Sequence, residues 1–193
     1  MIEQLPWLDG LHALSLAVAL AACAGLRAWL PLFLAAGLAR LGFLELGDSF
    51  AFLQSDKALV AFGLATALEI CADKIPAVDH ALDAISTVAR PAAGALLAAS
   101  VLGTVSEPLT AITLGVAVGA PSALAPHAAK SLVRAGATAF TGGLANPILS
   151  LIEDVATVVL FAVALIVPVL VVALLLLMLA AFWRRRGRQP VTA

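Results

Sequence analysis

Residues 155–182 contain no charged side chain, and Pro168 is the only strong helix breaker among them. At about 1.5 Å per helical residue, a stretch of this length exceeds the ~30 Å thickness of the hydrocarbon core of a bilayer. Backbone groups in hydrocarbon must be hydrogen-bonded within the chain, which a helix achieves by itself. The stretch therefore predicts a membrane-spanning helix that is tilted or kinked at Pro168.

The whole chain has the composition of an integral membrane protein. Hydrophobic residues make up 63% of its 193 residues and charged residues 12%, where soluble domains have about 45–50% and about 25%. The mean hydropathy is +1.09. A formal net charge of −1 provides no basic field, so no nucleic acid partner is expected. We predict an all-α fold, a polytopic integral membrane helical bundle of about six to seven spans whose main partner is the lipid bilayer.

The first apolar region, residues 11–44, is interrupted by Gly25, Arg27 and Pro31. Two helices of about 14 residues each would be ~21 Å long, which is too short to cross the bilayer core. We therefore expect this region to form either a tight hairpin or a broken, partly re-entrant helix pair. Further apolar segments follow at residues 58–73, 92–104 and 109–120.

Residues 77–89 differ from these apolar segments in their pattern. Apolar residues, among them Val78, share one helical face, and polar residues, among them Asp79, share the other. The segment lies between Pro76 and Pro91, which are expected to mark its two ends. It predicts one short amphipathic helix that lies in the plane of the membrane interface.

The second half of the chain contains another charged helix. Lys130 and Arg134 share one face of a helix predicted over residues 122–135. The Gly-Gly pair at residues 142–143 then interrupts the chain. Asn146, which precedes a proline, is predicted to be the N-cap of the following helix.

A weak internal repeat relates the two halves of the chain. Matching residues between Gly25 and Gly42 recur between Gly119 and Gly136 at a constant offset of 94. Leu-Glu-Ile at residues 68–70 is matched by Ile-Glu-Asp at residues 152–154. The repeat predicts a single membrane domain, residues 1–193, with half-repeats at residues 11–90 and 105–183. Parallel and inverted halves are both consistent with the sequence.

The end of the chain is basic. Arg184, Arg185, Arg186 and Arg188 directly follow the last apolar stretch. Because Lys and Arg are enriched in cytoplasmic segments, residues 184–193 are expected to form a basic cytoplasmic tail. Small residues within spans, such as Gly63 and Gly94, allow close helix contacts and are compatible with a homo-oligomer.

Four charged residues lie close together within otherwise apolar sequence: Glu69, Asp73, Lys74 and Asp79. Glu69 and Asp73 are four positions apart and share a helix face, where two carboxylates disfavour joint ionisation. Opposite charges nearby would relieve this repulsion. The candidate partners are Lys74, Arg27, Lys130 and Arg134, and Glu153 and Asp154 are further acids.

Without Asp79, this charged set contains four acids and four bases. A charge at the centre of a membrane helix costs roughly 2.5–3.5 kcal/mol on insertion scales, so we expect the set to meet inside the bundle. One interpretation is a polar staple between helices. The other is a solvated site that passes protons, ions or a small polar solute. The balance of charges is consistent with both.

The sequence does not predict an enzyme. It contains no Gly-rich phosphate loop, no nucleophile-elbow pattern, no Cys-rich metal spacing and no HExxH motif. Asp79, His80 and Asp83 are interpreted as the water-facing side of the amphipathic helix and not as metal ligands. We therefore expect no catalytic residue, no cofactor and no metal.

Several motifs resemble those of a known family. They are Gly25-Leu-Arg-Ala-Trp-Leu-Pro31, Glu69 with Ala72-Asp-Lys-Ile-Pro76 and Asp79, Arg90-Pro91 with Ala93-Gly94, Lys130 with Arg134, and Asn146-Pro147 with Ser150-Leu-Ile-Glu-Asp154. In this order they resemble the small bacterial integral membrane proteins grouped as domain of unknown function 4126, over residues 11–170. The resemblance implies a single multi-span helical domain in the bacterial cytoplasmic (inner) membrane and no particular activity. Its motif positions coincide with the charged set.

Two functional hypotheses follow. In the first, the chain is a small transporter or channel-like protein for an ion or small polar solute, with a path at broken helices near residues 25–31 and 119–126. Glu69 would then be the main proton- or cation-responsive group. In the second, it is a non-transporting membrane module that binds lipid or a protein partner, and the charges hold helices together.

Overall fold

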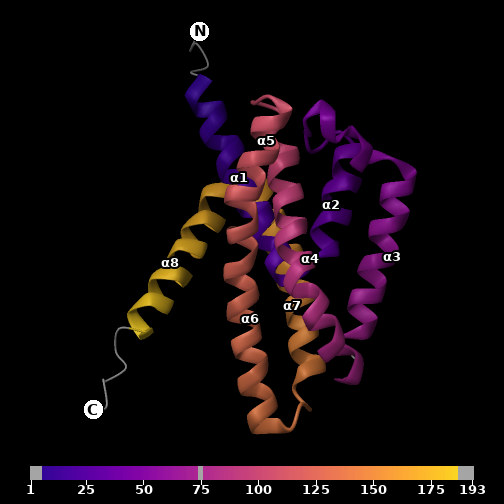
Figure 1. Ribbon diagram of the computed structural model, residues 1–193, viewed down its shortest axis with the longest axis vertical. Helices are drawn as coiled ribbons and strands as arrows, with labels where there is room; N and C mark the ends of the chain where they lie inside the picture. The colour runs from indigo at the N-terminus through magenta and orange to yellow at the C-terminus, as the bar shows by residue number, and fades with distance from the viewer. Residues whose placement is uncertain (1–5, 74–75, 187–193) are drawn as a thin grey trace.

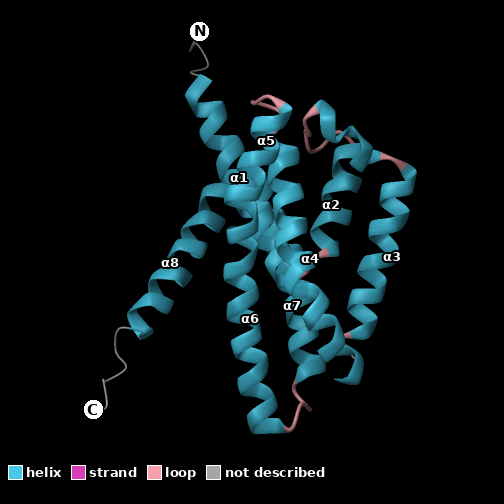
Figure 2. Ribbon diagram, viewed as in Figure 1, coloured by secondary structure: helices cyan, strands magenta, loops and turns pink. Residues whose placement is uncertain are grey.

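The computed structural model describes residues 6–73 and 76–186, apart from the side chains of residues 76–84 and of a few residues near the two ends. This part of the chain is helical and contains no strand, so the predicted all-α class is confirmed (Figure 2). In chain order the helices are α1 (Pro6–Leu26), α2 (Trp29–Arg40), the 3₁₀ helix η1 (Asp48–Gln54), α3 (Asp56–Ala72), α4 (Pro76–Leu102), α5 (Pro108–Leu114), the π-helical η2 (Gly115–Gly119), α6 (Ala120–Thr141), α7 (Asn146–Ile166) and α8 (Pro168–Arg186).

Helix α1 is the central helix of the bundle (Figure 1). It packs mainly against α4 and α6 and also contacts α7 and α8. Helices α2 and α3 stand together on one side, and α8 diverges from the bundle on the other. The buried core accordingly contains many small α1 residues, such as Ala17 and Ala21, together with Leu97 and Ala98 of α4. Such small side chains allow neighbouring helices to approach closely.

Glycines bring α4 into direct contact with the stretch from η2 to α6. A Cβ atom on Gly94 would lie 2.7 Å from the Cβ of Ala123 and 2.8 Å from the carbonyl oxygen of Gly119, so a larger residue does not fit there. The close helix contact predicted for Gly94 is therefore made within one chain.

The first apolar region forms two helices that are separated at Arg27 and Ala28. Helix α1 has 21 residues and α2 has 12, and their connection lies well inside the two ends of the molecule (Figure 2). Gly25 lies against the backbone of Ala123 on α6, where a side chain would clash. The predicted interruption is confirmed, but the two helices are unequal: α1 is long enough to cross a membrane and α2 is not.

Two predicted helix ends are wrong. The amphipathic segment at residues 77–89 is not a separate interfacial helix, because α4 continues through Pro91 to Leu102. Similarly, α5, η2 and α6 form one helical stretch from Pro108 to Thr141, with no break at residues 119–126. An internal proline removes one backbone hydrogen bond, and in packed membrane helices the freed carbonyl finds other partners.

The later breaks lie close to their predicted positions. Gly142, with a φ of 61°, ends α6 in the left-handed conformation that glycine adopts most easily. Helix α7 begins at Asn146, but the side chain of Asn146 bonds to Thr138 of α6, so its predicted role as N-cap is wrong. Pro168 begins a new helix and divides the span predicted over residues 155–182 in two.

Four helical stretches among the described residues are long and apolar enough to cross a membrane: Trp7–Leu26, Ile85–Leu102, Pro108–Thr141 and Asn146–Ile166. Helix α2 and the apolar part of α8 are shorter. The chain is therefore a membrane protein with several apolar helices, but the predicted six to seven spans are not confirmed by helix length. The C-terminal end of α3 lies at the same end of the molecule as the α6–α7 turn (Figure 1).

Candidate functional site

Six charged side chains from four parts of the chain converge beside the α1–α2 break. They are Arg27 in the break itself, Asp73 directly after α3, Lys130 and Arg134 on α6, and Glu153 and Asp154 on α7. We refer to these six residues as the ion-pair cluster. All six belong to the charged set that the sequence predicts.

Arg27 is the centre of the ion-pair cluster and has 0% exposure. Its Nη1 pairs with Asp73, and its Nε lies 2.7 Å from Oδ1 of Asp154. Its Nη2 donates to the hydroxyl and carbonyl oxygens of Ser150, at 2.8 and 3.0 Å, and lies 3.9 Å from Oε2 of Glu153. The planar guanidinium presents several donors in fixed directions, so one side chain joins α3 to α7.

Lys130 and Arg134 connect α6 to the same acids. Lys130 Nζ lies 2.8 Å from Oε2 of Glu153 and donates to the carbonyl oxygen of Leu26 at 3.3 Å, which satisfies a carbonyl at the end of α1. Arg134 holds Glu153 in a bidentate pair, with Nε 3.1 Å from Oε1 and Nη2 3.0 Å from Oε2. Arg134 Nη2 also donates to Asp73 at 3.1 Å.

The charges in the ion-pair cluster balance, since it contains three bases and three acids. Asp73 lies outside the four candidate spans. Its burial raises the pKa of its carboxyl group, but the charges of Arg27, Lys130 and Arg134 outweigh burial and hold this pKa below its ordinary value. Removing one member of a buried, paired set leaves an uncompensated charge, at a cost of about 3–5 kcal/mol. The cluster is therefore a cross-link between four segments.

Glu69 is bound differently, although it lies one turn before Asp73. Its Oε1 accepts a hydrogen bond from the backbone N–H of Ala28 at 3.0 Å, and its Oε2 accepts one from that of Trp29 at 3.2 Å. None of its contacts with described residues is an ion pair. The first N–H groups of a helix have no partner within that helix. Glu69 therefore caps α2 from a neighbouring helix and complements the positive end of the α2 dipole.

Glu69 also lines a cavity of about 360 Å³ between α2, α3 and α4, which we refer to as the Glu69 cavity. Its lining residues are Trp29, Ala65, Leu68, Glu69, Ala72, Ile85, Ser86 and Ala89. Glu69 and Ser86 are 6% and 8% exposed, whereas Leu68 and Ile85 are 70% and 63% exposed. The polar groups thus lie on the inner side of the cavity, and its outer side is at the surface between α3 and α4.

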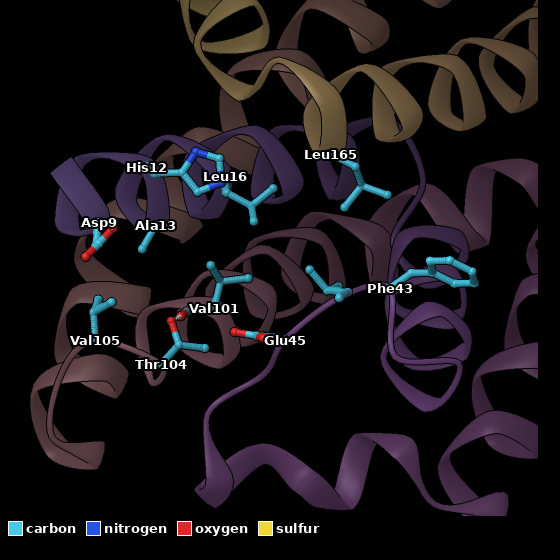
Figure 3. A pocket seen from close by; sticks show the side chains of 11 residues that line it. Asp9, His12, Ala13, Leu16, Phe43, Glu45, Val101, Thr104, Val105 and Leu165 are labelled. Carbon is cyan, nitrogen blue, oxygen red and sulfur yellow. Dashed lines mark hydrogen bonds between the residues drawn. The ribbon is translucent and has the colours of Figure 1, made fainter. Parts of the chain in front are cut away.

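Two other cavities lined by described residues lack this combination of a buried acid and a helix end. A cavity of about 460 Å³ near the beginning of α1 is lined by Asp9, His12 and Glu45, which are exposed, and by apolar neighbours (Figure 3). A cavity of about 190 Å³ between α1, α6 and α8 is almost entirely apolar and has Lys130 as its charged member. Within the described part of the chain, no group of three or more His, Cys, Asp or Glu side chains is placed to hold a metal ion.

Two contacts extend the polar network beyond the predicted charged set. Arg90 of α4, which is 1% exposed, contacts Nδ1 of His127 on α6. Ser150 of α7 accepts hydrogen bonds from Arg27. Arg90 lies in an apolar stretch, so the same cost argument that selects Arg27 would have found it. Ser150 carries no charge, so the cost argument does not select it, although it stands in one of the motifs that resemble the family.

The family model described as "Domain of unknown function (DUF4126)" matches residues 14–186. The chain belongs to this family. The match covers the ion-pair cluster and the Glu69 cavity, and it extends to Arg186, beyond the region over which the motifs resemble the family. No curated protein and no solved structure matches this DUF4126 chain.

The structure of this DUF4126 chain brings most of the predicted site residues together in the ion-pair cluster. The sequence predicts that the whole charged set meets, and for Glu69 this is wrong. Glu69 does not face Lys130 or Arg134, because its carboxylate binds the N–H groups at the start of α2. Lys74 lies outside the described residues, and the side chain of Asp79 is outside them as well.

Proposed function

We propose that this DUF4126 chain is a small transporter or channel-like protein for an ion or a small polar solute, with Glu69 as its working carboxylate. The observation that carries the proposal is the position of Glu69. It is buried, it forms no ion pair with the described residues, it lines a cavity, and it holds the beginning of a broken helix. Ionisable groups that are buried in a membrane protein are costly, and such a group favours a solute or proton pathway.

The broken helix itself supports this proposal. Carriers built from repeats place their sites at discontinuous helices, whose ends offer unpaired backbone groups to the solute. The weak repeat aligns α2 with α6 and α3 with α7, and each of these pairs runs in opposite directions (Figure 1). These directions favour inverted halves over parallel halves.

Glu69 would couple an arriving proton or cation to a movement of α3. Both of its oxygens accept hydrogen bonds from α2, which fits the ionised carboxylate. Protonation turns one oxygen into a donor, and a bound cation competes for the same lone pairs. Either event weakens the link between α3 and the start of α2 and so widens the adjoining cavity.

Flux measurements with the full chain in liposomes test this proposal. A trapped pH dye would report proton movement in response to imposed gradients of small cations and polar solutes. We expect flux through the wild type and a loss of at least tenfold in Glu69→Gln. The matched control is Asp56→Asn at the start of the same helix, where Asp56 forms an exposed pair with Arg40. Unchanged flux through a folded Glu69→Gln variant would remove the proposal.

The alternative function is a non-transporting membrane module that binds lipid or a protein partner. The balanced pairing of the ion-pair cluster favours it, because saturated charges hold helices together without needing a solute. Under this hypothesis the wild-type chain moves no solute, and deletion of residues 184–193 abolishes retention of the partner or of anionic lipid. Solute flux by the wild type would exclude it.

We also propose that the chain lies in a bacterial cytoplasmic membrane, has no enzymatic activity, and holds residues 184–193 on the cytoplasmic side. The four arginines of this region support that orientation, since positive residues are retained in the cytoplasm. A reporter that is active only in the cytoplasm, fused after Ala193, is expected to be active. A periplasmic reporter at the same position is expected to be silent.

A further inference from the structure

Among the described residues that line it, the Glu69 cavity contains one acidic side chain and no basic one. Glu69 accepts a backbone N–H on each oxygen, an arrangement that fits the ionised form. The guanidinium of Arg27, which directly precedes the two backbone donors of Glu69, is directed to Asp73 and Asp154. None of the ion pairs among the described residues includes Glu69. The cavity therefore favours a cationic occupant over an anionic one.

A second polar group faces this charge from another helix. Ser86 of α4 lines the cavity, is 8% exposed, and forms no hydrogen bond with any described residue. Because this hydroxyl borders the cavity and makes no bond to a described residue, it is available to a group that occupies the cavity. Glu69 and Ser86 together offer two acceptors, on α3 and on α4, to a group that carries at least two N–H donors.

The remaining walls fit an apolar body of modest size. The volume of about 360 Å³ lies within the range of roughly 300–1,000 Å³ that small-molecule sites occupy. Apolar surface is provided by the side chains of Ala65, Ala72 and Ala89. The indole ring of Trp29 also lines the cavity, and the face of such a ring attracts cations. Because the outer side lies between exposed Leu68 and Ile85, an amphiphilic molecule has direct access from the side of the bundle.

We propose that the Glu69 cavity binds a small primary or secondary ammonium ion with an apolar body. The ammonium group would pair with Glu69, donate a second N–H to Ser86, and place its body among the alanines. A quaternary ammonium has no N–H to donate, a carboxylate repeats the charge of Glu69, and an alcohol lacks the charge. As a transported substrate this ligand rests on the proposed function, but as a bound ligand it does not.

Binding to the full chain in nanodiscs tests the inference, with empty nanodiscs subtracted. Benzylamine is the probe, and benzyltrimethylammonium, benzoate and benzyl alcohol are its matched analogues. We expect benzylamine to bind and the three analogues to bind at least tenfold more weakly by calorimetry. Glu69→Gln is expected to weaken binding at least tenfold, and Ser86→Ala several-fold. Ala89→Leu fills the cavity and is expected to abolish binding, whereas Asp56→Asn leaves the affinity unchanged.

Two results would overturn the inference: benzoate binding as tightly as benzylamine, or full affinity in Glu69→Gln. If Glu69→Gln does not fold, wild-type affinity in both Ser86→Ala and Ala89→Leu overturns it instead. The two proposals fail separately. Amine binding without any flux would leave this site in place and remove transport, and flux of another solute without amine binding would do the reverse.

Discussion

The ion-pair cluster and the Glu69 cavity meet at the α1–α2 break, but their buried acids have different kinds of partner. Glu69 in the last turn of α3 and Asp73 directly after this helix are 6% and 5% exposed. Asp73 pairs with Arg27 and Arg134, so its charge is neutralised by side chains. Among the described residues, the partners of Glu69 are backbone N–H groups alone, and Glu69 lines a cavity. The neighbours of a carboxylate, and not its burial, therefore separate a structural charge from one that is available to a ligand.

The two regions depend on each other through the break in the chain. Arg27 is held by Asp73 and by partners on α7, and Lys130 of α6 binds the carbonyl oxygen of the preceding residue, Leu26. The next two residues, Ala28 and Trp29, present their N–H groups to Glu69. A rigid cluster on one side thus fixes the position of the helix start on the other side. The groups of a binding site are positioned most precisely when rigid neighbouring elements hold them in place.

The largest expected effect comes from breaking the cluster at its centre. Arg27→Met would leave Asp73 and Asp154 without their main partner in a buried setting. We expect a loss of stability of about 3–5 kcal/mol, seen as a large fall in Tm in detergent. The control is Arg40→Met, which removes an exposed pair with Asp56 and should cost about 0–1 kcal/mol.

Equal changes in Tm for these two arginine variants would contradict the interpretation of the cluster as a cross-link. In that case the buried charges would be no more important to the fold than a surface pair. The ion-pair cluster would then not differ from a surface ion pair in its contribution to the stability of the fold.

Double-mutant cycles test whether Glu69 is energetically separate from the ion-pair cluster. Arg134→Gln and Glu153→Gln remove the two partners of a bidentate pair, so their effects should be coupled by about 1–3 kcal/mol. Arg134→Gln and Glu69→Gln share no contact, and their effects should add to within about 0.5 kcal/mol. Chemical denaturation in mixed micelles measures the three single variants and the two double variants. Strong coupling between Glu69 and Arg134 would show that the carboxylates form one network.

A smaller effect on stability is expected from Glu69→Gln alone. Glutamine retains one oxygen acceptor for the start of α2 but loses the charge that complements the helix dipole, so the cost should be about 1 kcal/mol. Thermal unfolding in detergent measures it. A loss as large as that of Arg27→Met would mean that Glu69 is chiefly a structural group.

The cost of burying charge was enough to predict which side chains of the ion-pair cluster meet. Arg27, Lys130 and Glu153 are far apart in the sequence, and each would be expensive in lipid unless it had a partner, so their convergence follows from elementary electrostatics. The helix break near Gly25 and the turn at Gly142 were equally predictable from glycine and proline positions.

The place of Glu69 could not be predicted in the same way. A spacing of four residues shows that Glu69 and Asp73 share a face of α3, but it does not show that the two ends of this face meet different neighbours. The partners of Glu69 are backbone N–H groups, which every sequence contains. The passage of α4 through Pro91 was missed for a related reason, because tertiary packing overrides the local preference of proline to end a helix.

The smallest expected effect is that of Ser86→Ala, for which Ser150 in the other region provides the matched comparison. Ser150 accepts hydrogen bonds from the buried guanidinium of Arg27, so Ser150→Ala should cost about 1–3 kcal/mol. Ser86 has no hydrogen-bond partner among the described residues, so Ser86→Ala removes no bond and should change stability by less than about 0.5 kcal/mol. Thermal unfolding in the presence of benzylamine separates the roles further: the ligand should stabilise the Ser150→Ala variant as it does the wild type and stabilise Ser86→Ala less. If Ser86→Ala were as unstable as Ser150→Ala, the hydroxyl of Ser86 would contribute to the fold itself and would not be available to a ligand.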